Sequence, residues 1–191
     1  MNSIIIAAAT GEEPVSLDLA KAHCRIDVDD DDALIGEVYI PAARETVEEY
    51  TGLTLITSDV DVLVAGSQCT ATVIPLPIQP VQSLSAVSSV MRDGIETPLD
   101  IDEYGLTIAK TGKVVGVIVA RNGPLPRADF YRVQYVCGYA DGACPGNLML
   151  AMLEYVSDAY ENREAQQSQY ALNDNPRAVR LMDPFRITFG L

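Results

Sequence analysis

The chain has few of the residues from which metal centres and disulfide frameworks are built. Its 191 residues include one histidine and four cysteines, and no two cysteines stand in C-x-x-C spacing. A zinc site of histidine and cysteine ligands is therefore poorly supported, and a disulfide framework is not expected at this length. We expect reduced, partly buried thiols at Cys24, Cys69, Cys137 and Cys144.

Long apolar runs are also missing. Residues 4–9 are apolar, but the run is too short to span a membrane and lacks the basic residues that open a signal peptide. No other segment approaches eighteen apolar residues. We therefore expect a soluble protein with no membrane partner.

Catalytic motifs are absent as well. The sequence has neither a G-x-S-x-G nucleophile motif nor a phosphate-binding G-x-x-x-x-G-K-S/T loop. His23 and Cys24 are neighbours on a predicted helix, where adjacent side chains point about 100° apart and cannot form a nucleophile pair. Pairs of carboxylates are common in so acidic a chain, so they do not indicate general acid–base catalysis. We predict no catalytic residues, no cofactor and no enzymatic activity.

One acidic run invites a calcium interpretation and does not satisfy it. Asp27, Asp29 and Asp31 occupy positions one, three and five of an EF-hand loop. Position six should be glycine and is Asp32, while position twelve should be glutamate and is Val38. A solvated acidic turn fits better, and no metal site is predicted.

Basic residues are scarce. Thirteen lysines and arginines stand against 27 acidic residues, giving a net charge of −14. Binding to nucleic acid through its phosphates needs clustered basic side chains, so the negative net charge argues against such binding. It is compatible with a position near DNA without binding to it. The simpler alternative is that the charge only keeps the protein soluble.

Helix signals lie at the two ends of the sequence. Ser16 is a natural N-cap for a helix to about residue 25, and a second helix over residues 33–50 should stop at Gly52. Pro41 inside it predicts a kink or two shorter helices. A long helix should begin at Pro145, and a short one should begin after Asn175 and end before residue 183.

Between the helices the pattern is of strands and turns. Asp93-Gly94 predicts a hairpin, and residues 130–138 alternate as the clearest strand. Three prolines in residues 74–81 exclude a central strand there and favour an edge strand or extended connector. We predict a small antiparallel unit of about five to seven strands.

The predicted fold class is α+β. Two N-terminal helices and a long C-terminal helix form a frame, into which the antiparallel β unit is inserted, and a docking tail follows. The expected parts are residues 1–52, the first part of the frame; 53–144, the β insert; 145–164, the long helix; and 165–191, a flexible link and tail.

Many short stretches have a characteristic order and spacing, among them AKAHCRID at 20–27, YTG at 50–52 and YENRE at 160–164. The other positions of this pattern are 15–17, 31–35, 42–45, 47–48, 76–77, 80–83, 93–94, 133–135, 138–139, Pro145, Leu148, Ala151, Leu181 and 184–186. Together these stretches resemble the head–tail connector (head-completion adaptor) family of long-tailed bacteriophages and gene transfer particles. Pro41 and Cys24 depart from the family pattern.

The resemblance implies a non-enzymatic virion protein. Its copies, usually twelve, would form a ring in the neck between the portal protein and the stopper or tail-completion protein, after assembly in the bacterial cytoplasm. DNA would pass through the ring without specific binding.

Three sets of residues are candidates for these contacts. The basic tail is our choice for portal docking, with Arg177, Arg180, Phe185 and Arg186. An acidic stripe on the long helix, as lumen or simple wet face, comprises Glu154, Asp158 and Glu161. An apolar segment of the same helix, for subunit contact or core, comprises Leu148, Met149, Met152 and Leu153.

Two alternatives remain open. One is a small β-sandwich module for binding or regulation, which would fold and bind a ligand without its helices. The other is a hydrolase, which would need a pocket with a perturbed titratable group.

Overall fold

The computed structural model describes residues 3–111, 115–162 and 175–187. It divides into a β unit, residues 1–11 and 56–140, and a helical unit, residues 12–55 and 141–191. The fold class is α+β, as predicted. Residues 1–11 group with the sheets, although the sequence analysis had placed them with the helices.

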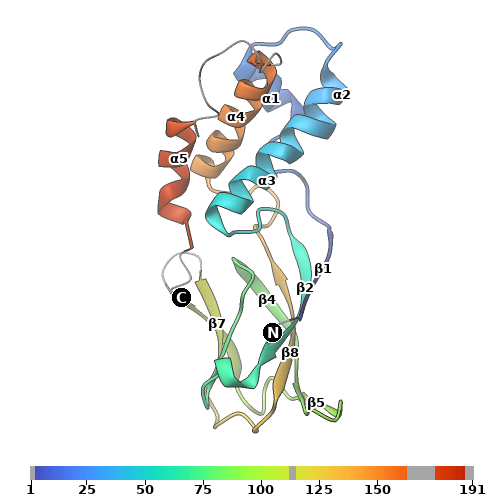
Figure 1. Cartoon of the computed structure of the whole chain (residues 1–191), viewed down its shortest axis with the longest axis vertical. Helices are drawn as coiled ribbons and strands as arrows, with labels where there is room; N and C mark the ends of the chain where they lie inside the picture. Colours follow the sequence, from blue (N-terminus) through green and yellow to red (C-terminus); the bar gives the residue numbers. More distant parts are fainter. Residues whose placement is uncertain (1–2, 112–114, 163–174, 188–191) are drawn as a thin grey trace. The chain divides into compact units, whose positions relative to one another are not determined.

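The β unit is a sandwich of two antiparallel sheets (Figure 1), in the strand orders β1-β2-β8-β4-β5 and β3-β7-β6. A 3₁₀ turn, η2 (Gly66–Gln68), follows the second strand. The strands are β1 (Ser3–Ala9), β2 (Ser58–Ala65), β3 (Val73–Pro75), β4 (Val81–Val90), β5 (Glu96–Leu99), β6 (Leu106–Thr111), β7 (Val115–Ala120) and β8 (Phe130–Cys137).

Period-two alternation builds the core of the sandwich. On β8 every second side chain is buried, as predicted, because successive residues of a strand point to opposite faces. Val62 on β2 lies opposite Val133 on β8, and both are fully buried. The proline-rich segment contributes only β3, at the edge of the smaller sheet, as its missing N–H donors require.

One buried amide joins the connector before β4 to β7. Gln79 is fully buried, and its Nε2 donates to the carbonyl oxygens of Leu76 at 2.7 Å and Gly116 at 2.9 Å. Its Oε1 accepts from the Gly116 amide at 2.8 Å. A Cβ at Gly116 would lie 3.1 Å from Cγ2 of Val81, so the close approach favours glycine. The amide is fully satisfied, as a buried polar group must be.

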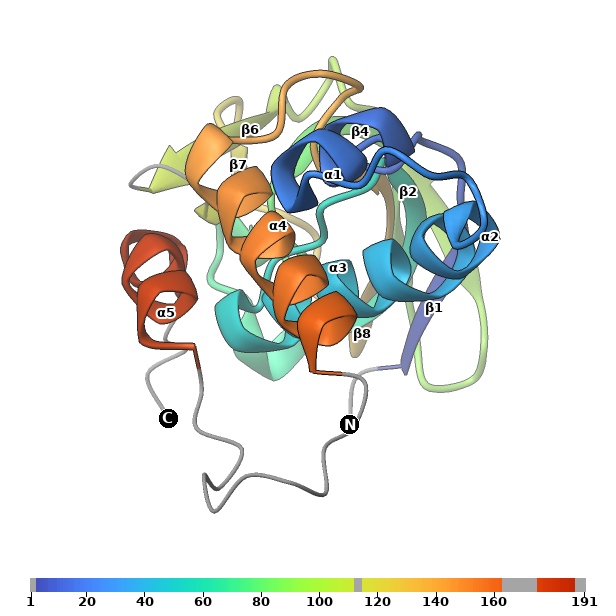
Figure 2. The same ribbon diagram turned by 90° about the horizontal axis from the view of Figure 1, so that it is seen from above.

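The helical unit is built around one long helix. In Figure 2, α4 (Gly146–Glu161) lies between α5 (Pro176–Met182) and the N-terminal helices α1 (Leu17–Cys24) and α3 (Ile40–Thr51), and it contacts all three. The remaining elements are α2 (Asp32–Leu34), the π-helical turn η1 (Ile35–Tyr39) and the 3₁₀ turn η3 (Asp183–Phe185). No helix of the described segments is long and apolar enough to cross a membrane.

Local capping follows the sequence signals. Ser16 Oγ accepts from the Leu19 amide at 3.2 Å, and Gly52 closes α3 with φ of +72°. The predicted irregularity at Pro41 takes the form of η1, in which the Ile40 amide bonds to the carbonyl of Ile35. Pro41 then stands in the first turn of α3, where its missing N–H costs least.

Candidate docking surfaces of the helical unit

The helix α5 is fixed to the rest of the helical unit by its apolar side. Ala178 and Met182 are fully buried. Asn175 caps the helix, because its Oδ1 accepts from the amides of Arg177 at 3.0 Å and Ala178 at 3.2 Å. Its Nδ2 also donates to Asp158 at 2.8 Å. Residues 175–187, the described part of the predicted link and tail, are therefore part of the folded unit, whereas the predicted link at 165–174 lies outside the described residues.

The residues after α5 are held by the end of α3. The Tyr50 hydroxyl donates to Asp183 at 2.6 Å, and the Arg186 guanidinium lies 5.1 Å from the centre of the Tyr50 ring. The Ile187 amide donates to the Thr51 carbonyl at 2.8 Å. A cation over an aromatic face gains about 0.5–1 kcal/mol at an exposed site.

These contacts separate the four predicted portal-docking residues. Arg177 pairs with Glu154 at 2.9 Å, Arg186 stacks on Tyr50, and Phe185 is half-buried. Arg180 is exposed, and no ion pair forms at its guanidinium within the described part of the chain. Of the four residues, Arg180 therefore has the charge that is most available to a partner protein.

The predicted acidic stripe of α4 is not uniformly solvent-facing. Glu154 pairs with Arg177 and Asp158 accepts from Asn175, so α5 engages both carboxylates. Glu161 is exposed, and Ser157 donates to it at 3.4 Å. The assignment of this stripe to a lumen remains a prediction.

The apolar segment of α4 lies largely inside the subunit. Leu148 and Met152 are fully buried, Leu153 is 6 % exposed, and Met149 is half-buried. Most of this surface is therefore used by the unit's own core. Of these four side chains, only that of Met149 is exposed enough to contact another subunit.

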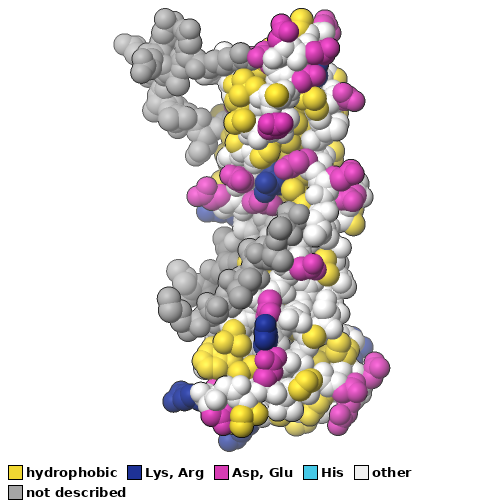
Figure 3. Space-filling model, turned by 90° about the vertical axis from the view of Figure 1, so that its right-hand side faces the viewer, with side chains coloured by type: hydrophobic (Ala, Val, Ile, Leu, Met, Phe, Trp, Pro, Cys, Tyr) yellow, Lys and Arg dark blue, Asp and Glu magenta, His cyan; other side chains and the backbone are white. Residues whose placement is uncertain are grey.

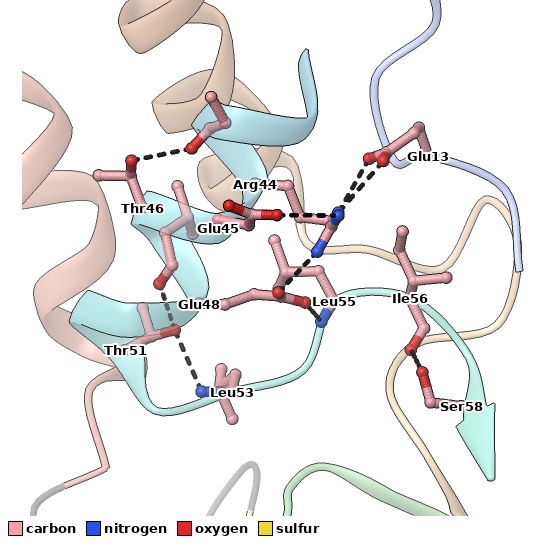
Figure 4. Close-up of polar contacts among 12 residues, drawn as sticks. Glu13, Arg44, Glu45, Thr46, Glu48, Thr51, Leu53, Leu55, Ile56 and Ser58 are labelled. Carbon is pink, nitrogen blue, oxygen red and sulfur yellow. Dashed lines mark hydrogen bonds and ion pairs between the residues drawn. The ribbon is translucent and has the colours of Figure 1, made fainter. Parts of the chain in front are cut away.

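An ion-pair network around Arg44 holds two extended segments onto α3 (Figure 4). Its Nε lies 3.2 Å from both carboxylate oxygens of Glu13, and its Nη1 lies 2.8 Å from Glu48. The other oxygen of Glu48 accepts from the Leu55 amide at 2.6 Å. Burial opposes the guanidinium charge, but Glu48 and Glu13 outweigh it and raise the pKa of Arg44.

A lysine pairs with two carboxylates of the acidic turn that had suggested calcium. The Lys21 ammonium lies 2.6 Å from both Asp29 and Asp32. Its hydrogen bond lowers the pKa of Asp29. In the described residues, no three His, Cys, Asp or Glu side chains gather in a way that could hold a metal ion.

Charge is distributed very unevenly between the two units. The helical unit has 19 acidic and 7 basic residues, a net charge of −12, whereas the β unit has 8 and 6, a net charge of −2. The face in Figure 3 shows Asp and Glu side chains spread over the helical unit, with few Lys or Arg. The helical unit thus has most of the chain's net negative charge.

Family and structure comparisons agree with this arrangement. Residues 14–96 match the model of a family described as phage gp6-like head-tail connector protein. The resemblance to head–tail connectors is confirmed. The matched segment includes α1, α3 and the first strands of the β unit after β1.

Solved structures share the fold over the whole chain. The neck of an empty gene transfer agent (GTA) particle, computed with C6 symmetry, aligns with a TM-score of 0.75 at 20% identity. The virion of a native gene transfer agent particle and the neck of a native GTA particle with C12 symmetry give 0.72 and 0.71, both at 21% identity. Each alignment covers 100% of this chain and 97% of the other. No curated protein matches in sequence. At these identities the likeness to the solved structures is one of fold.

Sequence reasoning missed the residues that tie the helical unit together. Arg44 and Glu48 stand four apart on a helix, a spacing that could have indicated their pair. Glu13 and Tyr50 have partners 31 and 133 residues away, and no local pattern marks them.

Proposed function

We propose that the chain is a non-enzymatic connector in the neck of a phage or gene transfer particle. Twelve copies close side by side into a ring that binds the portal protein on one side and the stopper or tail-completion protein on the other. The genome passes through without specific binding. The protein assembles in the bacterial cytoplasm and acts in the virion, with no membrane partner.

The uneven charge supports this proposal most directly. A passage for DNA must let the duplex slide, and acidic walls repel phosphates that clustered basic side chains would retain. The helical unit has a net charge of −12, and its acidic turn and α3 expose many carboxylates. Necks with C6 and C12 symmetry share the fold, and a ring of twelve copies is compatible with both symmetries.

Loss of the protein from a particle-producing strain tests the connector role. We expect DNA-filled heads without tails, and full restoration by the gene supplied in trans. Purified wild-type particles should contain the chain at the same copy number as the portal protein, by quantitative mass spectrometry. Tailed, infectious particles without the chain would contradict the proposal.

Portal docking is proposed for the exposed face of α5, with Arg180 as its centre. Truncating the chain before α5 would be a poor test, because Ala178 and Met182 are core residues. The substitution Arg180→Glu leaves these residues in place. We expect it to weaken binding to purified portal at least tenfold, since a cation facing an acidic partner becomes repulsive.

Arg121→Glu is the matched control, because Arg121 is also an exposed arginine but lies in the β unit. It should bind portal as wild type does. If Arg180→Glu and Arg121→Glu bind equally well, the docking assignment is wrong, although the connector role would stand.

A further inference from the structure

The β unit contains an open cavity that the connector role does not use. Its volume is about 580 Å³, and its lining includes Gly66, Cys69, Leu125, Arg127 and Tyr131. Leu125 and Tyr131 are 7 % and 4 % exposed, so the cavity has an apolar floor. A cavity of this size accommodates several side chains.

Among the polar side chains that line the cavity, Arg127 has a charge that no described carboxylate pairs with. The Tyr131 hydroxyl donates to the Pro126 carbonyl at 2.5 Å, and burial raises the pKa of the Cys69 thiol to about 11. The thiol is therefore neutral at physiological pH. Arg127 is exposed, and among the residues that the structure covers no carboxylate pairs with it. The site favours an apolar group with a negative charge beside it.

The β4–β5 hairpin presents a group of that kind. Met91 and Ile95 at its tip are 46 % and 61 % exposed, and the exposed residues Arg92, Asp93 and Gly94 stand between them. The tip is ordered by hydrogen bonds from the Gly94 amide to the Met91 carbonyl at 2.9 Å and from the Ile95 amide to Asp93 at 3.0 Å. An apolar tip that is already ordered loses little conformational entropy when it binds.

The two features flank the start of β8, where Ala65 on one side and Val90 on the other both pair with Phe130. The Arg92 amide of the hairpin donates to Asp129, next to the cavity lining, at 2.8 Å. In Figure 1 the η2 turn, which contributes Gly66 to the cavity, lies on the left, and the β5 hairpin lies on the right. Surfaces placed in this way can meet between neighbouring copies, head to tail. Such a heterologous contact, repeated, closes a ring.

We propose that the hairpin tip of one copy inserts into the cavity of the next. Met91 and Ile95 cover the apolar floor, and Asp93 meets Arg127 at the rim. This inference rests on the proposed ring and names one of its contacts. A stable interface needs about 800 Å² per partner, so the tip is an anchor within a larger surface.

Cross-linking tests the contact directly, because Cys69 already lines the cavity. In the full-length chain, Met91→Cys places a thiol on the tip. Mild oxidation at high protein concentration should give a ladder of covalent oligomers on a non-reducing gel. Peptide mapping should find an interchain disulfide between position 91 and Cys69.

Two controls make the result specific. Adding Cys69→Ser to Met91→Cys should abolish the ladder. Val28→Cys, at an equally exposed apolar position of the helical unit, should give no disulfide to Cys69. A ladder that persists without Cys69, a purely intrachain disulfide, or no product would overturn the proposal.

A double-mutant cycle tests the rim contact in the same cross-linking assay. Asp93→Asn removes the charge and keeps a side-chain oxygen for the Ile95 amide. Asp93→Asn or Arg127→Gln, each with Met91→Cys, should reduce the ladder at least fivefold, and the two together should reduce it little further. Asp59→Asn, at an exposed acid on β2, should have little effect. If the two reductions multiply, the pairing is wrong. A neck map that contains the ring without this contact would refute only the contact, whereas absence from the neck would refute the connector role itself.

Discussion

The two units have nearly equal lengths and very different net charges. The β unit has a net charge of −2 and closes on alternating apolar side chains and one buried amide. The helical unit has a net charge of −12, and it adds ion pairs at Arg44, Lys21 and Arg177 to an apolar core of its own. In the proposed ring, the charged unit would repel the DNA and the nearly neutral unit would supply a packed scaffold.

The largest effect on stability is expected in the core of the neutral unit. Gln79→Ala leaves the Gly116 amide and two carbonyl oxygens without partners, which should cost about 3 kcal/mol of unfolding free energy. Urea unfolding and faster hydrogen exchange along β7 would measure it. Gln134→Ala, an exposed amide on β8, is the control and should cost about 0.5 kcal/mol. Equal losses of unfolding free energy in the two variants would show that the buried amide does not stabilise the core of the β unit.

A smaller effect is expected in the charged unit from its most buried ion-pair network. Arg44→Met leaves the carboxylates of Glu13 and Glu48 without their cation, and we expect a loss of about 2 kcal/mol. Glu45→Gln removes only a 4.0 Å contact to an exposed carboxylate and should change stability by less than about 0.5 kcal/mol. Thermal unfolding of both variants would decide, and similar melting temperatures would contradict the role of the network.

Acid should weaken the β unit through Asp61. Hydrogen bonds from Arg132 lower the pKa of Asp61, against the opposing effect of partial burial. A lowered pKa in the folded state gives stability that is present above the unfolded value of about 4 and is lost as pH falls through the folded value. The pair is partly exposed, so the effect should be about 0.5 kcal/mol. Stability of Asp61→Asn should vary less than wild type between about pH 4 and pH 2.

The smallest effect is expected at the exposed acidic turn. Lys21→Gln removes both ion pairs to Asp29 and Asp32, but surface pairs contribute little. The urea midpoint should stay within error of wild type at physiological salt, with any difference at low salt removed by added sodium chloride. A clear loss at high salt would mean that the turn is part of the folded core.

Much of the local structure could be predicted because its causes are local. Ser16 and Gly52 mark helix ends, the Asp93-Gly94 pair marks a hairpin, and the alternation along β8 marks a buried face. Each depends on residues close together in the chain.

The rest depends on partners that are distant in the sequence. The strand β1 has an apolar sequence without alternation, and its place is set by pairing with β2, where Ile4 lies opposite Val62. Arg177 was predicted as a docking residue, but its pairing with Glu154 arises from the packing of α5 on α4. No periodicity in the sequence specifies such contacts.

A map of the particle neck with the portal in place tests the central claim most directly. The account predicts a closed ring of this chain directly below the portal, with carboxylates of the helical unit lining the passage around the duplex. A passage lined by arginine and lysine, or a neck in which this chain is absent, would contradict it.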